Sequence, residues 1–174
     1  MASEIEESLG AGSFEASVAA LALAKARAVA ARVAEGVVLG ADTVVVIDGV
    51  ALGKPVDGED AKTMLRRLRG RAHDVVTGVA VVDAARGREE SRADVTRVVM
   101  ADVSDDVVDA YVASGEPLDK AGAYAIQGRG GALVVGFVGS YSNVVGLPLG
   151  VTAELLRRHG VPINAFGEGP ERWA

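Results

Sequence analysis

GADTVVVIDG, residues 40 to 49, is the stretch that decides the fold. Its β-branched residues continue a run that begins at position 37, and they predict a buried strand over residues 37 to 47. Asp48 and Gly49 follow as a turn pair that can reverse the chain into a short partner strand. Near the start of this hydrophobic run lies Asp42, and a buried carboxylate without a partner is costly. Asp42 therefore either caps a neighbouring element or belongs to a functional site.

The segment before this strand predicts a long helix. Residues 14 to 35 are rich in alanine and contain no proline, and Ser13 stands where a helix cap is expected. The apolar residues at mostly helical spacing are Val18, Leu21, Val29 and Val33. Gly36 then ends the helix.

The segments after the strand alternate between helical and strand patterns. Asp57 stands as an N-cap, with Asp60 three residues on, before a short helix. A polar link around Gly87 separates two β-rich runs, which predicts an antiparallel hairpin. The predicted elements are a helix at 61 to 69, strands at 74 to 83 and 92 to 101, a helix from 104 to about 115, a strand at 132 to 138 and a helix at 148 to 159. This mixed order predicts an α/β fold with a long twisted sheet, and a flexible tail over residues 164 to 174.

The composition excludes several classes of protein and site. With no cysteine among 174 residues, the chain has no disulfide, thiolate metal site or cysteine nucleophile. The formal net charge of −6 offers no basic field for a nucleic-acid duplex. The apolar stretch at 16 to 34 is interrupted by three basic residues and cannot cross a bilayer, and the first residues, MASEIEES, do not resemble a secretory signal. We expect a cytoplasmic protein without a nucleic-acid or membrane partner.

Asp42 and Lys54 have the most suggestive chemistry. A carboxylate beside a phosphate-bound cation can serve as a metal ligand or a general base, which is the functional interpretation of Asp42. Lys54 lies between Gly53 and Pro55, so we expect an extended backbone and an ammonium that can bind phosphate as a point charge. The alternative for Lys54 is a solvated surface lysine, the commonest state of this residue type.

Two loop-like stretches are further candidates. Residues 115 to 128, GEPLDKAGAYAIQG, contain Gln127, which can read a base edge or orient water. Asp119 and Lys120 in this stretch can form a local ion pair and nothing more. Residues 139 to 148, GSYSNVVGLP, lead into a helix, so Asn143 and the backbone amides can face a ligand there. The alternative for this second stretch is a plain connection between a strand and a helix.

Other catalytic motifs are absent from the sequence. His73 and His159 do not have the spacing of a metal-ligand pair, and we interpret both as structural, His73 beside a strand and His159 near a helix end. No GxSxG elbow, Walker P-loop or GxGxxG fingerprint occurs.

Three blocks of the sequence together resemble the Maf family of septum formation inhibitor-like proteins. In order they are GADTVVVIDGVALGKPVDGEDAKTMLRRLRGRAHDVVTGVAVV, YVASGEPLDKAGAYAIQG and GSYSNVVGLPL. Three long motifs in the right order are more specific than any one, and the similarity runs from about Ser3 to His159. The resemblance implies an extended mixed sheet flanked by helices, as in inosine triphosphate pyrophosphatases, over residues 1 to 163. It also implies a homodimer that cuts a nucleoside triphosphate between its α and β phosphates.

The resemblance also implies roles for single residues. Asp42 matches the family's proton acceptor and would act with a divalent cation, Mg²⁺ or Mn²⁺. The residues that match substrate-binding positions are Glu7, Lys25, Thr43, Lys54 and Gln127. Of these, Lys54 would lie near the phosphates, and Thr43 and Gln127 are associated with nucleotide choice. A threonine after the aspartate resembles the branch that acts on dTTP and UTP, whereas the 7-methyl-GTP branch tends to carry glutamine there.

At one segment the sequence departs from the family pattern. Family members begin with a strand and an SxSPRR-type loop that grips the triphosphate, and no SPRR occurs in this chain. Bidentate arginine contacts to phosphate are strong, and a distant lysine does not replace them. Either about 25 to 30 residues precede Met1, the length of a strand, a loop and a helix, or this form is an impaired nucleotide-binding protein of division arrest. A pyrophosphatase of other base specificity, for 7-methyl-GTP or CTP, ranks lower because of Thr43.

Overall fold

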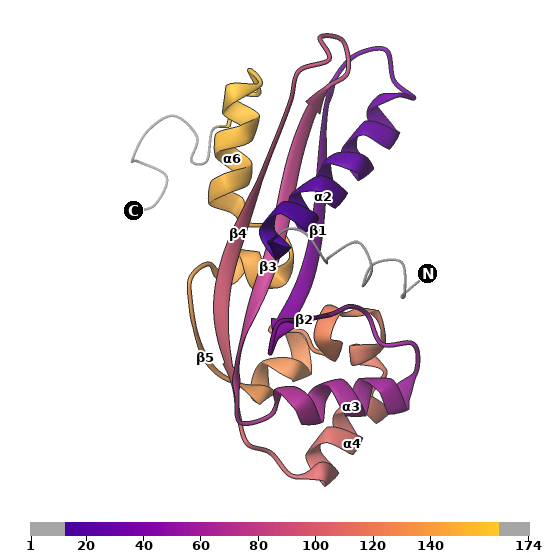
Figure 1. Cartoon of the computed structure of the whole chain (residues 1–174), viewed down its shortest axis with the longest axis vertical. Helices are drawn as coiled ribbons and strands as arrows, with labels where there is room; N and C mark the ends of the chain where they lie inside the picture. The colour runs from indigo at the N-terminus through magenta and orange to yellow at the C-terminus, as the bar shows by residue number, and fades with distance from the viewer. Residues whose placement is uncertain (1–12, 164–174) are drawn as a thin grey trace, which may run out of the picture.

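A computed structural model describes residues 13 to 163 (Figure 1). The helices are α2 (Phe14–Ala30), α3 (Gly58–Leu68), α4 (Asp105–Ala113), α5 (Tyr141–Val145) and α6 (Leu149–Arg158). The strands are β1 (Val37–Ile47), β2 (Val50–Leu52), β3 (Ala72–Asp83), β4 (Glu89–Met100) and β5 (Val134–Val138). Three short 3₁₀ helices are η1 (Glu116–Asp119), η2 (Ala121–Ala123) and η3 (Gly128–Leu133). The predictions for Glu7 and for the tail lie outside the described residues, and an upstream strand stays a prediction.

The strands form a five-stranded sheet in the order β2-β1-β3-β4-β5. The long twisted sheet flanked by helices is therefore confirmed. Every pairing within residues 13 to 163 is antiparallel, whereas the resemblance implied a mixed sheet. The predicted hairpin explains part of this difference, because β3 and β4 are joined by a tight turn that can link only antiparallel neighbours. The short connection from β1 to β2 has the same effect.

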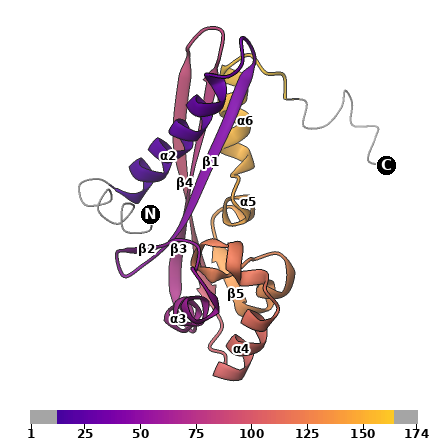
Figure 2. The same ribbon diagram turned by 90° about the vertical axis from the view of Figure 1, so that its right-hand side faces the viewer.

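Helices cover the two faces of the sheet and a lobe closes one end. Figure 2 shows α2 on one face and α5 and α6 on the opposite face. Even-numbered residues such as Val44 and Val76 pack under α2, whereas Val79 and Val81 pack against Leu155 of α6. Helices α3 and α4 and the 3₁₀ turns gather at the lower end of the sheet in Figure 1, around the largest core cluster.

Helix α2 packs unusually close to the sheet because small residues meet at the contact. A Cβ atom at Gly78 would lie 2.2 Å from the carbonyl oxygen of Val18, and one at Gly40 would lie 2.4 Å from that of Ala22. Both glycines are therefore required where helix backbone and strand backbone approach. This close approach brings the next turns of α2, including Lys25, against β1.

The predicted apolar face of α2 is wrong for all but one residue. The buried residues are Val18, Ala22, Ala26 and Ala30, whereas Leu21, Val29 and Val33 are exposed. The helix also ends at Ala30, five residues before the predicted end, and residues 31 to 36 are all exposed. Helical propensity extends further than the sheet that stabilises the helix, so the unpacked residues leave the helical conformation.

Several local predictions are confirmed. Strand β1 has the predicted limits, and Asp48 and Gly49 both adopt positive φ in the turn to β2. Ser13 caps α2 by accepting a hydrogen bond from the N–H of Ala16 at 3.3 Å, and Asp57 caps α3 by accepting one from Asp60 at 2.9 Å. None of the helices in the described region is long and apolar enough to span a bilayer.

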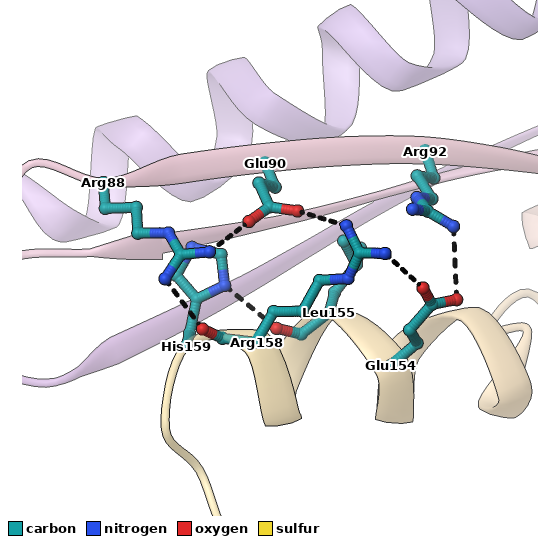
Figure 3. A network of polar contacts seen from close by, with 7 residues as sticks. All are labelled: Arg88, Glu90, Arg92, Glu154, Leu155, Arg158 and His159. Atoms are coloured by element: carbon teal, nitrogen blue, oxygen red, sulfur yellow. Dashed lines mark hydrogen bonds and ion pairs between the residues drawn. The ribbon is translucent and has the colours of Figure 1, made fainter.

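Helix α6 is fastened to β4 by a group of ion pairs (Figure 3), and it packs on the half of the sheet away from the lobe (Figure 1). Glu154 of α6 bonds Arg92 at 3.2 Å and Arg158 at 2.7 Å, and Glu90 of β4 bonds Arg88 at 2.7 Å and Arg158 at 3.4 Å. We call these five residues the α6–β4 network. His159 lies buried beside it at the end of α6, with Nδ1 2.9 Å from the Leu155 carbonyl, which fits its structural interpretation.

Candidate active site

A cleft of about 540 Å³ lies between the edge of β1 and the lobe. Strand β2 pairs only with residues 45 to 47 of β1, so residues 41 to 43 have no strand on this side within the described part of the chain. Five residues predicted for the site line the cleft together, namely Lys25, Asp42, Thr43, Lys54 and Gln127. The volume lies within the range of about 300 to 1,000 Å³ that is usual for small-molecule sites.

Lys25 and Asp42 form an ion pair at the sheet face covered by α2. The Nζ atom of Lys25 lies 2.5 Å from Oδ1 of Asp42 and 3.4 Å from the carbonyl oxygen of Ala41. The Asp42 side chain is 19% exposed, so it is partly shielded but still reachable from the cleft. Its second oxygen, Oδ2, makes no hydrogen bond to residues 13 to 163. The carboxylate is thus held at one oxygen and open at the other.

Lys54 and Lys120 enter the same cleft from the lobe side. Lys54 is exposed and makes no ion pair with the described residues. Lys120 lies 2.5 Å from Asp119, as the local ion pair predicted. Its hydrogen bond, together with the more distant charge of Lys54, lowers the pKa of the Asp119 carboxyl. Lys54 is therefore the cleft lysine that is left open to bind an anion.

Thr43 lies on the opposite face of β1 from Asp42, and Gln127 also lines the cleft. Successive strand residues point to opposite faces, so Thr43 faces the lobe and α5 while Asp42 faces α2. The wall on the Thr43 side includes Tyr124, Ile126 and Gly146. We call Lys25, Asp42 and Lys54 the charged half of the cleft, and Thr43, Tyr124, Ile126 and Gln127 its more neutral half.

Glu116 organises the loop that carries Gln127, and the sequence reasoning did not single it out. Its carboxylate accepts hydrogen bonds from the N–H groups of Arg129 at 3.1 Å and Gly130 at 2.9 Å and from the hydroxyl of Tyr111 at 2.9 Å. These backbone donors are the largest cause of the lowered pKa of Glu116. The Tyr111 oxygen also accepts the N–H of Ala125 at 3.2 Å.

We call these hydrogen bonds of Glu116 and Tyr111 the Glu116 clasp. The clasp holds the loop on both sides of Gln127, at Ala125 and at Arg129 and Gly130. A Cβ atom at Gly128 would lie 2.8 Å from Oε2 of Glu116, and the residue has φ of +79°, so glycine is needed next to Gln127. In the sequence, the glycine-rich stretch after Gln127 was a possible signal for a nearby acceptor such as Glu116, because its backbone N–H groups need acceptors.

Asn143 does not face the cleft, which corrects the prediction that it meets a ligand. It is fully buried, and its side-chain amide donates to the Val75 carbonyl at 3.1 Å and to the Thr96 hydroxyl at 2.9 Å. The alternative of a plain connection is also incomplete, because residues 139 to 148 contain the short helix α5. Ser140 caps α5, so Asn143 points inward and ties it to β3 and β4.

Comparison with known proteins places this geometry in a family. The Maf-like protein family matches residues 1 to 159. The chain belongs to the Maf family. Its fold, with a long sheet flanked by helices, agrees with that membership, and the residues that resemble the Maf motifs converge on one cleft.

Individual Maf proteins are similar to this chain over most of its length. A protein of Moorella thermoacetica is 57% identical over 148 residues, which cover 85% of this chain and 76% of the relative. One from Symbiobacterium thermophilum is 53% identical over 86% of this chain and 76% of its own length. A third, from Myxococcus xanthus, is 53% identical over 93% and 82%. All three are named dTTP/UTP pyrophosphatase.

The cleft fits a divalent cation that arrives with a nucleotide. Among the described residues no group of three or more histidines and carboxylates could hold a metal. Mg²⁺ does not need such a cage, because it is often bound by one or two carboxylates together with substrate phosphates and water. Asp42, with its open Oδ2, is the carboxylate that would hold the cation. Since the described lining has as many carboxylates as lysines, it cannot neutralise a triphosphate alone.

Proposed function

We propose that this Maf protein hydrolyses a nucleoside triphosphate between the α and β phosphates and releases a nucleoside monophosphate and pyrophosphate. The observation that carries the proposal is the cleft that Asp42, Lys25 and Lys54 share, with Oδ1 of Asp42 held by Lys25 and Oδ2 open. A carboxylate fixed in this way can take a proton from a water molecule positioned for attack on phosphorus. The two ammonium groups suit the phosphate oxygens.

The charged half of the cleft is the proposed place of the triphosphate. Lys54 would bind phosphate oxygens and stabilise the negative charge on the leaving pyrophosphate. Lys25 holds Asp42 in place and adds a positive charge beside the reacting phosphate. A bound Mg²⁺ or Mn²⁺ beside Asp42 would neutralise phosphate charge. Asp42 would accept a proton from the water that attacks the phosphorus atom.

The more neutral half of the cleft is the proposed place of the base. Thr43 and Gln127 line it with the apolar wall of Tyr124 and Ile126. A flat pyrimidine suits such a wall, and the similar proteins are named for dTTP and UTP. We therefore propose dTTP and UTP as the preferred substrates.

The proposal is tested by measuring pyrophosphate release from dTTP, UTP, CTP, GTP and 7-methyl-GTP with Mg²⁺, Mn²⁺ or a chelator. We expect metal-dependent turnover that is highest with dTTP and UTP. Asp42→Asn should lower kcat by at least about 100-fold, the usual contribution of a general base. Calorimetry with dTTP distinguishes the enzyme from the alternative, a protein that binds nucleotides without cleaving them. Binding of dTTP without release of pyrophosphate would contradict the proposal. Full turnover by Asp42→Asn would remove Asp42 from the mechanism.

Assembly and location are also proposals. The resemblance to Maf proteins supports a homodimer, and light scattering after size-exclusion chromatography would show a mass of twice the chain. We also propose a cytoplasmic location, where the nucleotide substrates are found. Fractionation of cells that express the full-length protein would test it.

A further inference from the structure

Two threonine hydroxyls meet beneath the more neutral half of the cleft. Thr43 of β1 and Thr77 of β3 are register partners, and their Oγ1 atoms are 2.9 Å apart. Thr77 is fully buried, whereas Thr43 is half-buried and lines the cleft. The Thr77 hydroxyl donates to the carbonyl oxygen of Asn143 at 3.2 Å. The three groups form a chain that leads from the cleft into the core.

The number of hydroxyl protons on Thr43 and Thr77 fixes the direction of the hydrogen bonds between them. A threonine hydroxyl has one proton to donate and two lone pairs that accept. Because Thr77 gives its proton to the Asn143 carbonyl, the proton between the two threonines belongs to Thr43. The Thr43 hydroxyl then has only lone pairs to offer the cleft.

The Asn143 end of this hydrogen-bonded chain is held in place by further hydrogen bonds. The Asn143 carbonyl also accepts the N–H of Gly146 at 2.9 Å, at the end of α5. The Asn143 amide group is fixed by Val75 and Thr96, as described above. Reorientation of Thr77 would therefore give up a hydrogen bond to a carbonyl that cannot move with it.

We infer that Thr77 is a positioning residue that makes the Thr43 hydroxyl a hydrogen-bond acceptor toward the cleft, so that the site selects a nucleotide with a donor at this point. The inference rests on the proposed function. Uracil and thymine carry an N–H at ring position 3, whereas cytosine carries an unprotonated nitrogen there. With cytosine, lone pairs would face lone pairs, and sites built to bond one group discriminate strongly against an analogue that cannot make the bond.

UTP and CTP are the matched pair for the test, because their bases have the same size and differ in this donor and its neighbour. We expect Thr77→Val to lower the ratio of kcat/KM for UTP over CTP by about tenfold, the equivalent of one hydrogen bond. The variant frees the Thr43 proton, which can then be donated to cytosine. Thr77→Ser restores a hydroxyl and should keep the ratio within about twofold of wild type.

Thr96→Val is the control for a merely structural effect. It removes a hydroxyl from another fully buried threonine that bonds Asn143, but Thr96 makes no hydrogen bond with Thr43. It should lower the melting temperature and shift the UTP to CTP ratio less than Thr77→Val does. If Thr77→Val does not fold, Thr77→Ala, which also removes the hydroxyl, gives the same comparison.

The outcomes separate this inference from the proposed function. An unchanged ratio in a folded, active Thr77→Val protein, or an equal shift in Thr96→Val, would overturn the role of Thr77 and leave the pyrophosphatase proposal intact. If the wild type releases no pyrophosphate from any nucleotide, the proposed function fails. The ratio of the calorimetric Kd values for UTP and CTP then still decides the polarity of Thr43.

Discussion

The α6–β4 network and the active-site cleft use the same kinds of charged groups in opposite ways. In the network each carboxylate has two guanidinium partners, Glu90 with Arg88 and Arg158, and Glu154 with Arg92 and Arg158 (Figure 3). The hydrogen bond from Arg88 is the largest cause of the lowered pKa of Glu90. In the network, therefore, the charges satisfy one another.

The cleft keeps binding capacity unused. Lys54 makes no ion pair with the described residues, and Asp42 uses one of its two oxygens. Exposed ion pairs contribute only about 0 to 1 kcal/mol each to stability. We therefore expect changes in the network to have small effects on stability and none on catalysis. Changes in the cleft should have large effects on catalysis.

After Asp42→Asn, the largest effect on activity in this comparison is expected from Lys54→Met. The variant removes the open ammonium and should lower kcat/KM for dTTP by about 30- to 150-fold, since a hydrogen bond to a charged group is worth about 2 to 3 kcal/mol. The matched control is Lys62→Met, because Lys62 of α3 is already paired with Glu59 and Asp109. Steady-state kinetics of both variants measure the difference. Equal losses in the two variants would refute a special role for Lys54.

A buried neutral pair supplies the next test, through the pH dependence of stability. Nε2 of His73 lies 2.7 Å from the Tyr124 hydroxyl, and burial lowers the pKa of His73 to about 4, with a smaller effect from the charge of Arg97. Between that value and the unfolded pKa of 6.5, only the unfolded state binds the proton, so stability falls as pH falls. The full contribution, on the order of 3 kcal/mol, is present above that window.

His73→Gln keeps a polar partner for Tyr124 and does not titrate. Between pH 7 and pH 4 the free energy of unfolding should therefore fall more in the wild type than in the variant. Urea unfolding at several pH values measures it. A constant difference across this window would show that His73 has the same pKa in the folded and unfolded protein.

A smaller effect is expected at the Glu116 clasp. Glu116→Gln replaces an oxygen that accepts a backbone N–H by an amide that donates, so it should loosen the Gln127 loop. We expect KM for dTTP to rise about three- to tenfold, the equivalent of about 1 kcal/mol, with kcat within about twofold. Asp119→Asn removes the same charge from a more exposed side chain of the same 3₁₀ turn and should raise KM less. A fall in kcat with unchanged KM would contradict a positioning role for Glu116.

The smallest effect is expected from Glu154→Gln in the α6–β4 network. It weakens two exposed ion pairs and should lower stability by less than about 1 kcal/mol, a shift in Tm of less than about 4 °C. High salt should reduce the difference further. Thermal melts at two salt concentrations measure this, and activity should equal that of wild type. A marked loss of activity would mean that the network and the cleft are coupled.

The features that the sequence by itself determined depend on residues close together in the chain. The limits of β1, the Asp48–Gly49 turn and the Ser13 and Asp57 caps all follow from the properties of a few adjacent residues. Capping and turn formation involve side chains and backbone groups at most four positions apart, so a single stretch contains the information. The motif resemblance likewise named five residues of the described cleft, although not how they meet.

Only the tertiary structure decided which faces are buried and where polar groups are bonded. Alanines of α2 are buried in place of Leu21 and Val29 because the helix backbone lies against Gly40 and Gly78, which are distant in sequence. The Glu116 clasp joins segments 13 and 14 residues apart, and Thr77 meets Asn143 across 66 residues. Such contacts arise when strands and helices pack, and local propensity contains no signal of which partners they will have.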